Sequence, residues 1–306
     1  MLRYTLKRFL SMLVTLFLVA TVTFFLMHAV PGQPFELTRE TPDSVRQALE
    51  AKLGLDKPLI EQYFIYMRNL LRGDFGISMK YKGQSVIGEV TSGMPISAVI
   101  GFGGVLVGCI IGAVLGAVAA LKNKGAVDYM VIILAILGVS VPNFVFGSLI
   151  QRYFAVEWKL FPIQGWKTWQ CAILPIMAAA FTNIAYYARM LRSSMLDVMG
   201  QDYIYTARSK GLSEAQVVRG HMLRNSFLPL VTSLGPMCAG VLTGNFVIEK
   251  IFNIPGIGQS MILAIQNTDY TMIMGLTIIF AFISIVCYFL VDIVYGLVDP
   301  RIRIAK

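Results

Sequence analysis

Long stretches without a charged residue dominate the chain. Six of them are 21 residues or longer, and they cover residues 9–35, 90–121, 129–151, 168–188, 225–248 and 270–291. A helix needs about 20 apolar residues to cross the roughly 30 Å hydrocarbon core of a bilayer. The pattern therefore predicts an all-α, polytopic membrane protein with six transmembrane helices.

Composition and charge agree with a membrane protein. Of 306 residues, 56% are hydrophobic and 14% are charged, whereas soluble domains carry about 25% charged residues. Arg3, Lys7 and Arg8 precede the first apolar run and predict a cytoplasmic N-terminus. Six crossings then place the C-terminus in the cytoplasm too, and the cytoplasmic segments hold 14 basic and 6 acidic residues. Since this asymmetry accounts for most of the net charge of +9, nucleic acid is not indicated as a partner.

The stretch Phe9–Val30 is too long for a typical signal-peptide core and is interpreted as a retained first helix.

Several kinds of chemistry find no support in the sequence. The four cysteines are far apart in apolar runs, so neither a disulfide framework nor a metal site is expected. The chain has no phosphate-binding loop, no zinc-binding His pair and no nucleophile elbow. We therefore expect no ATPase site, catalytic residue or cofactor in this chain.

Residues 31–89 form a polar segment that follows the first apolar run. It has signals for a helix over 41–53, ended by Gly54, and for a second helix from Pro58 to just before Gly73. One face of the second helix would carry Tyr63, Tyr66, Met67 and Leu70. Residues 74–82 lack a helical period. We interpret the segment 31–89 as a lid or docking surface, the alternative being a solvated cap.

Small and helix-breaking residues mark the later runs. Glycines recur every four residues on one face of the second run, at Gly104, Gly108, Gly112 and Gly116. Such a face lets a neighbouring helix approach closely, so we interpret it as a helix-packing surface. Kinks are expected at four prolines, Pro142, Pro175, Pro229 and Pro236. A turn at 254–258 and a short amphipathic helix at 259–267 are also expected, with Ile262, Leu263 and Ile265 facing apolar neighbours.

The loop 189–224 carries complete start and stop signals for two short helices. Asp202 can cap a helix over 203–210, which Gly211 ends. Ser213 can cap a second helix, with Gln216 completing a capping box. A folded helix-glycine-helix hairpin is typical of a docking element for a soluble partner, although it could also pack only against its own bundle.

The same loop resembles a known family. Residues 202–213, followed by 221–225 and Pro229, resemble the divergent EAA loop of peptide-type ABC importer permeases. Residues 249–258, 269–270 and 291–303 resemble the same peptide-type group. Residues 1–35 and 75–81 resemble the B-type subunit of oligopeptide permeases. Two departures are Tyr205-Thr206-Ala207, where the general motif has Glu-Ala-Ala, and Ile77, where proline is expected.

The resemblance implies a type I ABC importer permease fold in a bacterial cytoplasmic membrane. It also implies an assembly with a second homologous permease, two cytoplasmic ATPases that bind ATP and Mg, and an extracytoplasmic peptide-binding protein. The chain would consist of a transmembrane helix (1–35), an extracytoplasmic segment (36–89) and a permease core (90–299) with five transmembrane helices. The residues implied in ATPase coupling are Tyr205, Thr206, Ala207, Arg208, Lys210, Gly211, Leu212 and Ser213.

The substrate path is a separate hypothesis that rests on uncharged polar residues within the apolar runs. Such groups hydrogen-bond a peptide backbone without trapping it. The candidates are Asn143, Asn183, Tyr186, Tyr187 and Asn245, of which Asn183, Tyr186 and Tyr187 cluster just before the hairpin. We thus interpret the chain as a permease subunit that forms half of an oligopeptide translocation pathway. Alternatives are a static channel, a membrane sensor subunit, or a permease for dipeptides or nickel.

Overall fold

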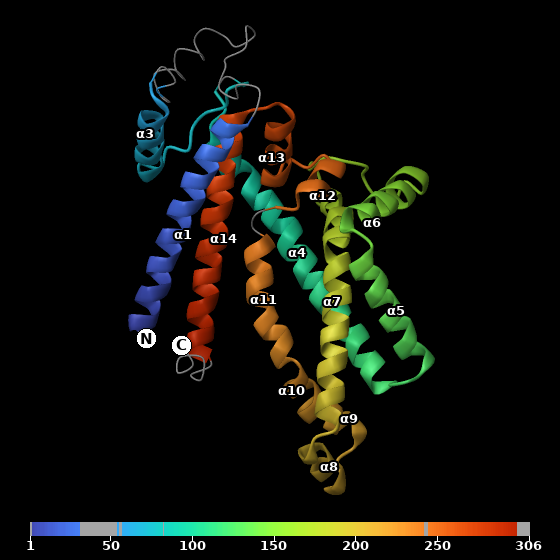
Figure 1. Ribbon diagram of the computed structural model, residues 1–306. Coiled ribbons are helices and arrows are strands. Elements are labelled where there is room, and N and C mark those ends of the chain that lie inside the picture. Colours follow the sequence, from blue (N-terminus) through green and yellow to red (C-terminus); the bar gives the residue numbers. More distant parts are fainter. Residues whose placement is uncertain (1, 31–53, 55–56, 82, 242–243, 299–306) are drawn as a thin grey trace. The chain divides into compact units, whose positions relative to one another are not determined.

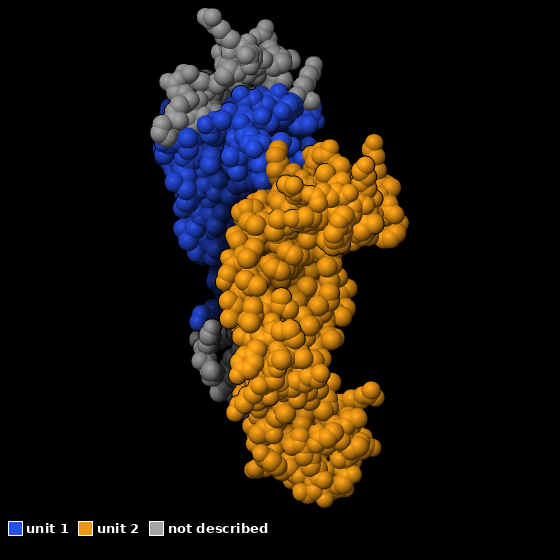
Figure 2. Space-filling view, turned by 90° about the vertical axis from the view of Figure 1, so that its right-hand side faces the viewer, with its two compact units in different colours: residues 1–97, 242–246, 255–306 blue, residues 98–241, 247–254 orange. Residues whose placement is uncertain are grey.

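The described part of the protein is helical and divides into two compact units. The computed structural model describes residues 2–30, 54, 57–81, 83–241 and 244–298. Unit 1 comprises residues 1–97, 242–246 and 255–306, and unit 2 comprises residues 98–241 and 247–254 (Figure 2). The chain passes between the units within the long helix α4 (Val86–Leu121) and within α12 (Phe246–Ile251). The helix expected over 41–53 lies outside the described residues.

Unit 1 is built around a pair of long apolar helices, α1 (Leu2–Ala29) and α14 (Tyr270–Val298). Its further elements are α3 (Leu59–Leu71), the first turns of α4, and α13 (Ile257–Gln266). The helices α1 and α14 pack along each other (Figure 1). A core of aliphatic and aromatic side chains joins α4, α13 and α14, with Val86, Ile257 and Leu276 fully buried.

The helix α3 confirms the expectation for residues 58–72. It begins directly after Pro58, whose ring is preorganised for a helix start. It ends before Gly73, which has a left-handed conformation with φ of 77°. The predicted apolar face packs inward, with Tyr66 buried against Phe24 of α1 and Met274 of α14. This contact attaches the polar segment to the long helices of unit 1.

Unit 2 is centred on the long helix α7 (Ile173–Met199). The elements around it are α4 from residue 98, α5 (Ala126–Ser140), α6 (Asn143–Ile150), the π-helix η1 (Gln151–Glu157) and the 3-10 turn η2 (Trp169–Ala172). The chain continues through α8 (Asp202–Ser209), α9 (Glu214–Val217), the π-helix η3 (Val218–Leu223), α10 (Arg224–Ser226) and α11 (Leu228–Val241). Both α5 and α6 pack against α7 (Figure 1).

The described residues do not reproduce six separate spans. Within the described part of the chain, four helical stretches are long and apolar enough to cross a membrane, namely Thr5–Ala29, Val86–Leu121, Trp169–Met199 and Tyr270–Ile293. The run 129–151 is no single helix, because the chain bends by 103° between α5 and the α6–η1 segment. Counting this bent pair as one span gives five. The run 225–248 contains α11, which is only 14 residues long.

Two of the four prolines stand at breaks between helices: Pro142 lies at the bend between α5 and α6, and Pro229 follows the break between α10 and α11. Pro175 lies in the first turn of α7, where the missing N–H requires no kink, and Pro236 lies inside α11. The prediction for α13 is wrong in part. In α13, Leu263 and Ile265 are 39% and 54% exposed, whereas the opposite face is buried.

Candidate functional site

The first helix of the hairpin begins at a different residue from the one predicted. Gln201 occupies the capping position with extended backbone, and α8 starts at Asp202. The cap prediction for Asp202 is therefore wrong, because its own backbone is already helical. Its carboxylate instead lies in the first turn, where the positive end of the helix dipole favours an acidic side chain.

The turn between the two helices follows the predicted chemistry. Gly211 has φ of 80°, a left-handed conformation that costs glycine little, and its N–H donates to the carbonyl of Arg208 at 2.9 Å. The backbone N–H of Ser213 donates to Oε1 of Gln216 at 2.9 Å in a capping box at the start of α9. The glycine stop and the capping box are both confirmed.

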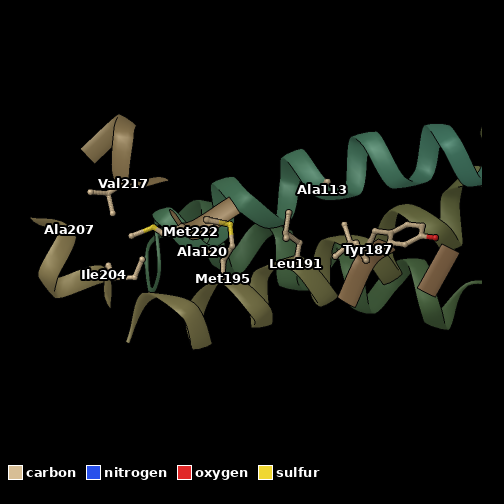
Figure 3. Packing of buried hydrophobic residues seen from close by; sticks show 10 residues of the cluster. Ala113, Ala120, Tyr187, Leu191, Met195, Ile204, Ala207, Val217 and Met222 are labelled. Carbon is tan, nitrogen blue, oxygen red and sulfur yellow. The ribbon is translucent and has the colours of Figure 1, made fainter. Parts of the chain in front are cut away.

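A small apolar core holds the hairpin against the end of α7. Ile204 of α8 and Val217 of α9 are fully buried, and Figure 3 shows them gathered near Met222 and Met195. Burying an aliphatic side chain of this size contributes about 1.5 to 3 kcal/mol. Ala207 is also buried, at 5% exposure, so it shapes the hairpin from inside rather than forming its surface.

The outer surface of the hairpin is aromatic and basic. Tyr205 is 57% exposed, and Thr206, Lys210, Gly211 and Ser213 are exposed as well. Arg208 and Glu214 pair across the turn, with Nε 2.8 Å from Oε1. Since this pair is solvent-exposed, it contributes less than about 1 kcal/mol to stability. The surface is suited to contact with an acidic or hydrogen-bonding partner.

An ion pair that the sequence analysis missed lies beside the hairpin. Nη2 of Arg192, two turns before the end of α7, donates to Oδ2 of Asp128 at 2.8 Å, and Nε donates to the other carboxylate oxygen. The backbone N–H of Lys124 also donates to Oδ2, at 2.9 Å. The Asp128 side chain is 2% exposed, so the pair fixes the 122–128 turn to α7. The available signal was a lone acidic residue at the border of an apolar run.

The four regularly spaced glycines of α4 lie against α7. A Cβ atom added to Gly112 would lie 2.7 Å from the carbonyl oxygen of Ile184 and 2.8 Å from Cβ of Tyr187. Gly104, Gly108 and Gly116 meet α7 at similarly short range. The two helix backbones therefore touch along three turns, and any larger residue on this face would separate them.

The substrate-path candidates do not share one environment. Tyr187 is fully buried, and its hydroxyl donates to Sδ of Met237 at 3.0 Å. Asn183 donates to the carbonyl of Ala179 in its own helix at 3.1 Å. Tyr186, by contrast, is 36% exposed. Asn143 begins α6 in unit 2, whereas Asn245 belongs to unit 1. Of the three clustered residues, Tyr186 is thus the most exposed.

Comparison with known proteins identifies the family. Residues 112–304 match the family described as "Binding-protein-dependent transport system inner membrane component", and residues 1–88 match its N-terminal counterpart. The chain belongs to this family. Its matched regions include the complete hairpin, the glycine face from Gly112 onward and the ion pair beside the hairpin. Binding-protein-dependent components of this kind are inner-membrane proteins, in agreement with the several apolar helices.

Full-length relatives of this inner-membrane component carry names from peptide transport. The dipeptide transport system permease protein of Bacillus subtilis (strain 168) is 44% identical over 306 residues, covering 100% of this chain and 99% of the relative. Its counterpart in Lactococcus lactis is 44% identical, covering 99% and 100%. The oligopeptide transport system permease protein of Escherichia coli (strain K12) is 39% identical, covering 99% and 100%.

A solved structure shares the fold of this inner-membrane component. A chain in the crystal structure of an amino acid ABC transporter with histidines superposes with a TM-score of 0.53 and 15% sequence identity. The match covers 67% of this chain and 92% of the solved chain. At this identity the likeness concerns the arrangement of helices alone, and it supports the expected ABC permease fold.

Proposed function

We propose that the chain is a translocation subunit of an ATP-driven peptide importer. The observation that carries this proposal is the similarity to dipeptide and oligopeptide permeases at 39% to 44% identity over essentially the full chain. The two dipeptide permeases have the higher identity. We therefore extend the expected substrate class from oligopeptides to short peptides that include dipeptides.

The hairpin of α8 and α9 is proposed to dock onto the cytoplasmic ATPases. Its buried apolar underside and its exposed Tyr205 and Lys210 support a role as a docking element. The partners would be two ATPases that hold ATP and Mg, a second permease and an extracytoplasmic peptide-binding protein. Both termini would be cytoplasmic, which the basic residues near the N-terminus support. The transmembrane helix (1–35), extracytoplasmic segment (36–89) and core (90–299) remain the proposed division.

Within the translocation path, Tyr186 is the preferred contact with cargo. Its exposed position on α7 supports this role, whereas the burial of Tyr187 supports helix packing instead. Asn143, Asn183 and Asn245 remain proposed path residues. A Trp at position 186 should slow uptake of peptides while leaving assembly with the ATPases unchanged.

Peptide uptake in a deletion strain tests the proposed function. Cells that lack this chain should lose ATP-dependent uptake of labelled di- to hexapeptides, and a plasmid copy should restore it. The purified chain alone should hydrolyse no ATP, whereas the reconstituted complex should do so in the presence of loaded binding protein. Uptake of nickel without any peptide would overturn the substrate class, and currents from the chain alone would favour a channel.

A further inference from the structure

The exposed side of α3 is divided into an apolar and a charged flank. Ile60, Phe64 and Leu71 are 57%, 65% and 87% exposed. Residues four and seven positions apart lie on one side of a helix, so these three form a continuous apolar stripe. A soluble helix would carry polar side chains along an exposed stripe of this kind.

Charged residues occupy the neighbouring flank. Glu61, Arg68 and Arg72 are all exposed, and a rotation of about 100° per residue places them together, beside the apolar stripe. The remaining side of α3, which carries Tyr66, is buried in unit 1. The helix thus has a protein-facing side, an apolar flank and a charged flank.

Contacts within unit 1 place α3 beside the C-terminal end of α1. The hydroxyls of Tyr63 and Thr21 lie 2.8 Å apart, and Oε1 of Gln62 lies 3.3 Å from Nε2 of His28. These α1 residues belong to the apolar stretch Thr5–Ala29, which is long enough to cross a membrane. The distance along the axis of α1 from Thr21 to the end of the helix is about 12 Å, at 1.5 Å per residue. α3 therefore lies alongside the last turns of a membrane span (Figure 1).

The apolar stripe of α3 continues an exposed apolar surface on α1. Phe25 and Leu26 are 38% and 59% exposed. The ring of Phe25 stacks on Tyr63 with centroids 5.4 Å apart, and Tyr63 in turn contacts the exposed ring of Phe64. Since α1 carries large exposed apolar side chains from Leu6 to Leu26, its outer face is suited to acyl chains. The stripe on α3 extends that face past the end of the span.

We propose that α3 is an interfacial helix that anchors unit 1 in the membrane. Ile60, Phe64 and Leu71 contact lipid acyl chains in the leaflet around the C-terminal end of α1. Glu61, Arg68 and Arg72 face the headgroups and water. An amphipathic helix with a charged face and large apolar side chains at this depth is the arrangement that favours the headgroup–acyl boundary. Tyr63 and Tyr66 add aromatic rings at the same level, where tyrosine is enriched.

Spin-label accessibility in the assembled importer tests this proposal. Single cysteines are introduced as Phe64→Cys and Leu71→Cys on the apolar flank and as Glu61→Cys and Arg68→Cys on the charged flank. The background has Cys109, Cys171, Cys238 and Cys287 replaced by alanine and retains peptide uptake. The complex is placed in lipid nanodiscs, and collision rates are measured with oxygen, which partitions into lipid, and with a water-soluble nickel chelate.

We expect positions 64 and 71 to collide more with oxygen than with the nickel chelate, and positions 61 and 68 to show the reverse. The four positions share one helix, so each flank is the control for the other. Stronger nickel collisions at 64 and 71 would show that the apolar flank faces water. Low accessibility to both reagents there would show that a protein subunit covers it. Either result overturns the lipid assignment.

Discussion

The hairpin of α8 and α9 and the segment 74–85 are both short connections between helices, but the segment is also bonded to a position far along the chain. The hairpin is closed by bonds between residues three to six positions apart, such as Ser213 with Gln216 and Arg208 with Glu214. In the 74–85 segment, Ser78 and Met79 both donate to the carboxylate of Asp269, about 190 positions later. Local bonds leave a signature in the sequence, whereas distant bonds do not.

The Asp269 carboxylate has two tasks in unit 1. Its Oδ1 accepts the N–H of Met79 at 3.1 Å and the N–H of Met272, in the first turn of α14, at 3.2 Å. The residue is 2% exposed. One side chain therefore caps α14 and clamps the 74–85 segment onto it. The hairpin has no comparable single residue, because its bonds are divided among several positions.

The largest effect is expected from removing this clamp. Asp269→Ala leaves the Ser78 hydroxyl and two backbone N–H groups without their acceptor, and each stranded buried donor costs about 1 to 3 kcal/mol. We expect a loss of about 3 kcal/mol in the free energy of unfolding, together with faster proteolysis within residues 74–85. Both can be measured on the purified chain in detergent.

Asp202→Ala is the matched control, because it removes an exposed carboxylate from the first turn of α8. It should cost only about 0.3 to 1 kcal/mol, the value of a helix-dipole interaction at a surface. Equal losses for the two variants would show that the distant bonds to Asp269 do not hold the segment.

A somewhat smaller effect is expected from the ion pair beside the hairpin. Asp128→Ala leaves the guanidinium of Arg192 without its partner. Because the Arg192 side chain is 23% exposed, water can replace part of the interaction. We expect about 2 kcal/mol of destabilisation, below the 3 to 5 kcal/mol typical of fully buried pairs. Chemical unfolding of the purified chain measures it.

The double variant Asp128→Ala with Arg192→Ala shows whether the loss arises from the stranded charge. It should recover part of the stability lost in Asp128→Ala alone. A double variant whose losses simply add would contradict a direct coupling between the two side chains.

The next effect concerns the backbone of the hairpin. Among the residues that the structure describes, no atom lies within 4 Å of a Cβ atom added to Gly211, so we ascribe the cost of Gly211→Val to the positive φ and not to a clash. We expect about 1 to 2 kcal/mol of local strain. Peptide-stimulated ATP hydrolysis by the reconstituted complex should fall, while the chain still inserts in the membrane.

Gly211→Asn provides the control, because asparagine tolerates the left-handed conformation better than valine. It should retain most of the coupled ATP hydrolysis. If Gly211→Val transports peptide at the normal rate, the hairpin is not the coupling element.

The smallest effect on stability is expected at the exposed pair of the hairpin. Arg208→Gln should change the free energy of unfolding by less than about 0.5 kcal/mol, since Arg208 and Glu214 are both solvated. A substantial loss of ATPase binding without a change in stability would assign Arg208 to the docking surface. A loss of stability above 1 kcal/mol would show that the pair holds the hairpin together.

The sequence predicted the local part of this structure well. Gly211, Ser213 and Gln216 predicted the hairpin turn because capping and left-handed conformations depend on neighbours within four residues. Pro58 and Gly73 similarly bounded α3. The error at Asp202 was one residue, which reflects how little the sequence distinguishes the last non-helical residue from the first helical one.

The long-range part was beyond the sequence for a physical reason. A charge-free run shows that residues avoid water, but it does not show whether the helix continues through Pro142 or bends there. The partners of Asp128 and Asp269 are 64 and about 190 positions away, and no periodicity relates them. Tyr187 looked as suitable for a substrate path as Tyr186, because only the packed helices reveal which of two adjacent rings is buried.

The most direct test of the proposed coupling is photo-crosslinking from the hairpin surface. A photoreactive amino acid at position 205, where Tyr205 is 57% exposed, is compared with one at Tyr153, which is 45% exposed on η1. The assembled importer is illuminated in membranes, and the covalent products are identified by mass spectrometry. We predict adducts with the ATPase subunits from position 205 and none from position 153. The absence of ATPase adducts from position 205 in an importer that still takes up peptide would contradict the proposal.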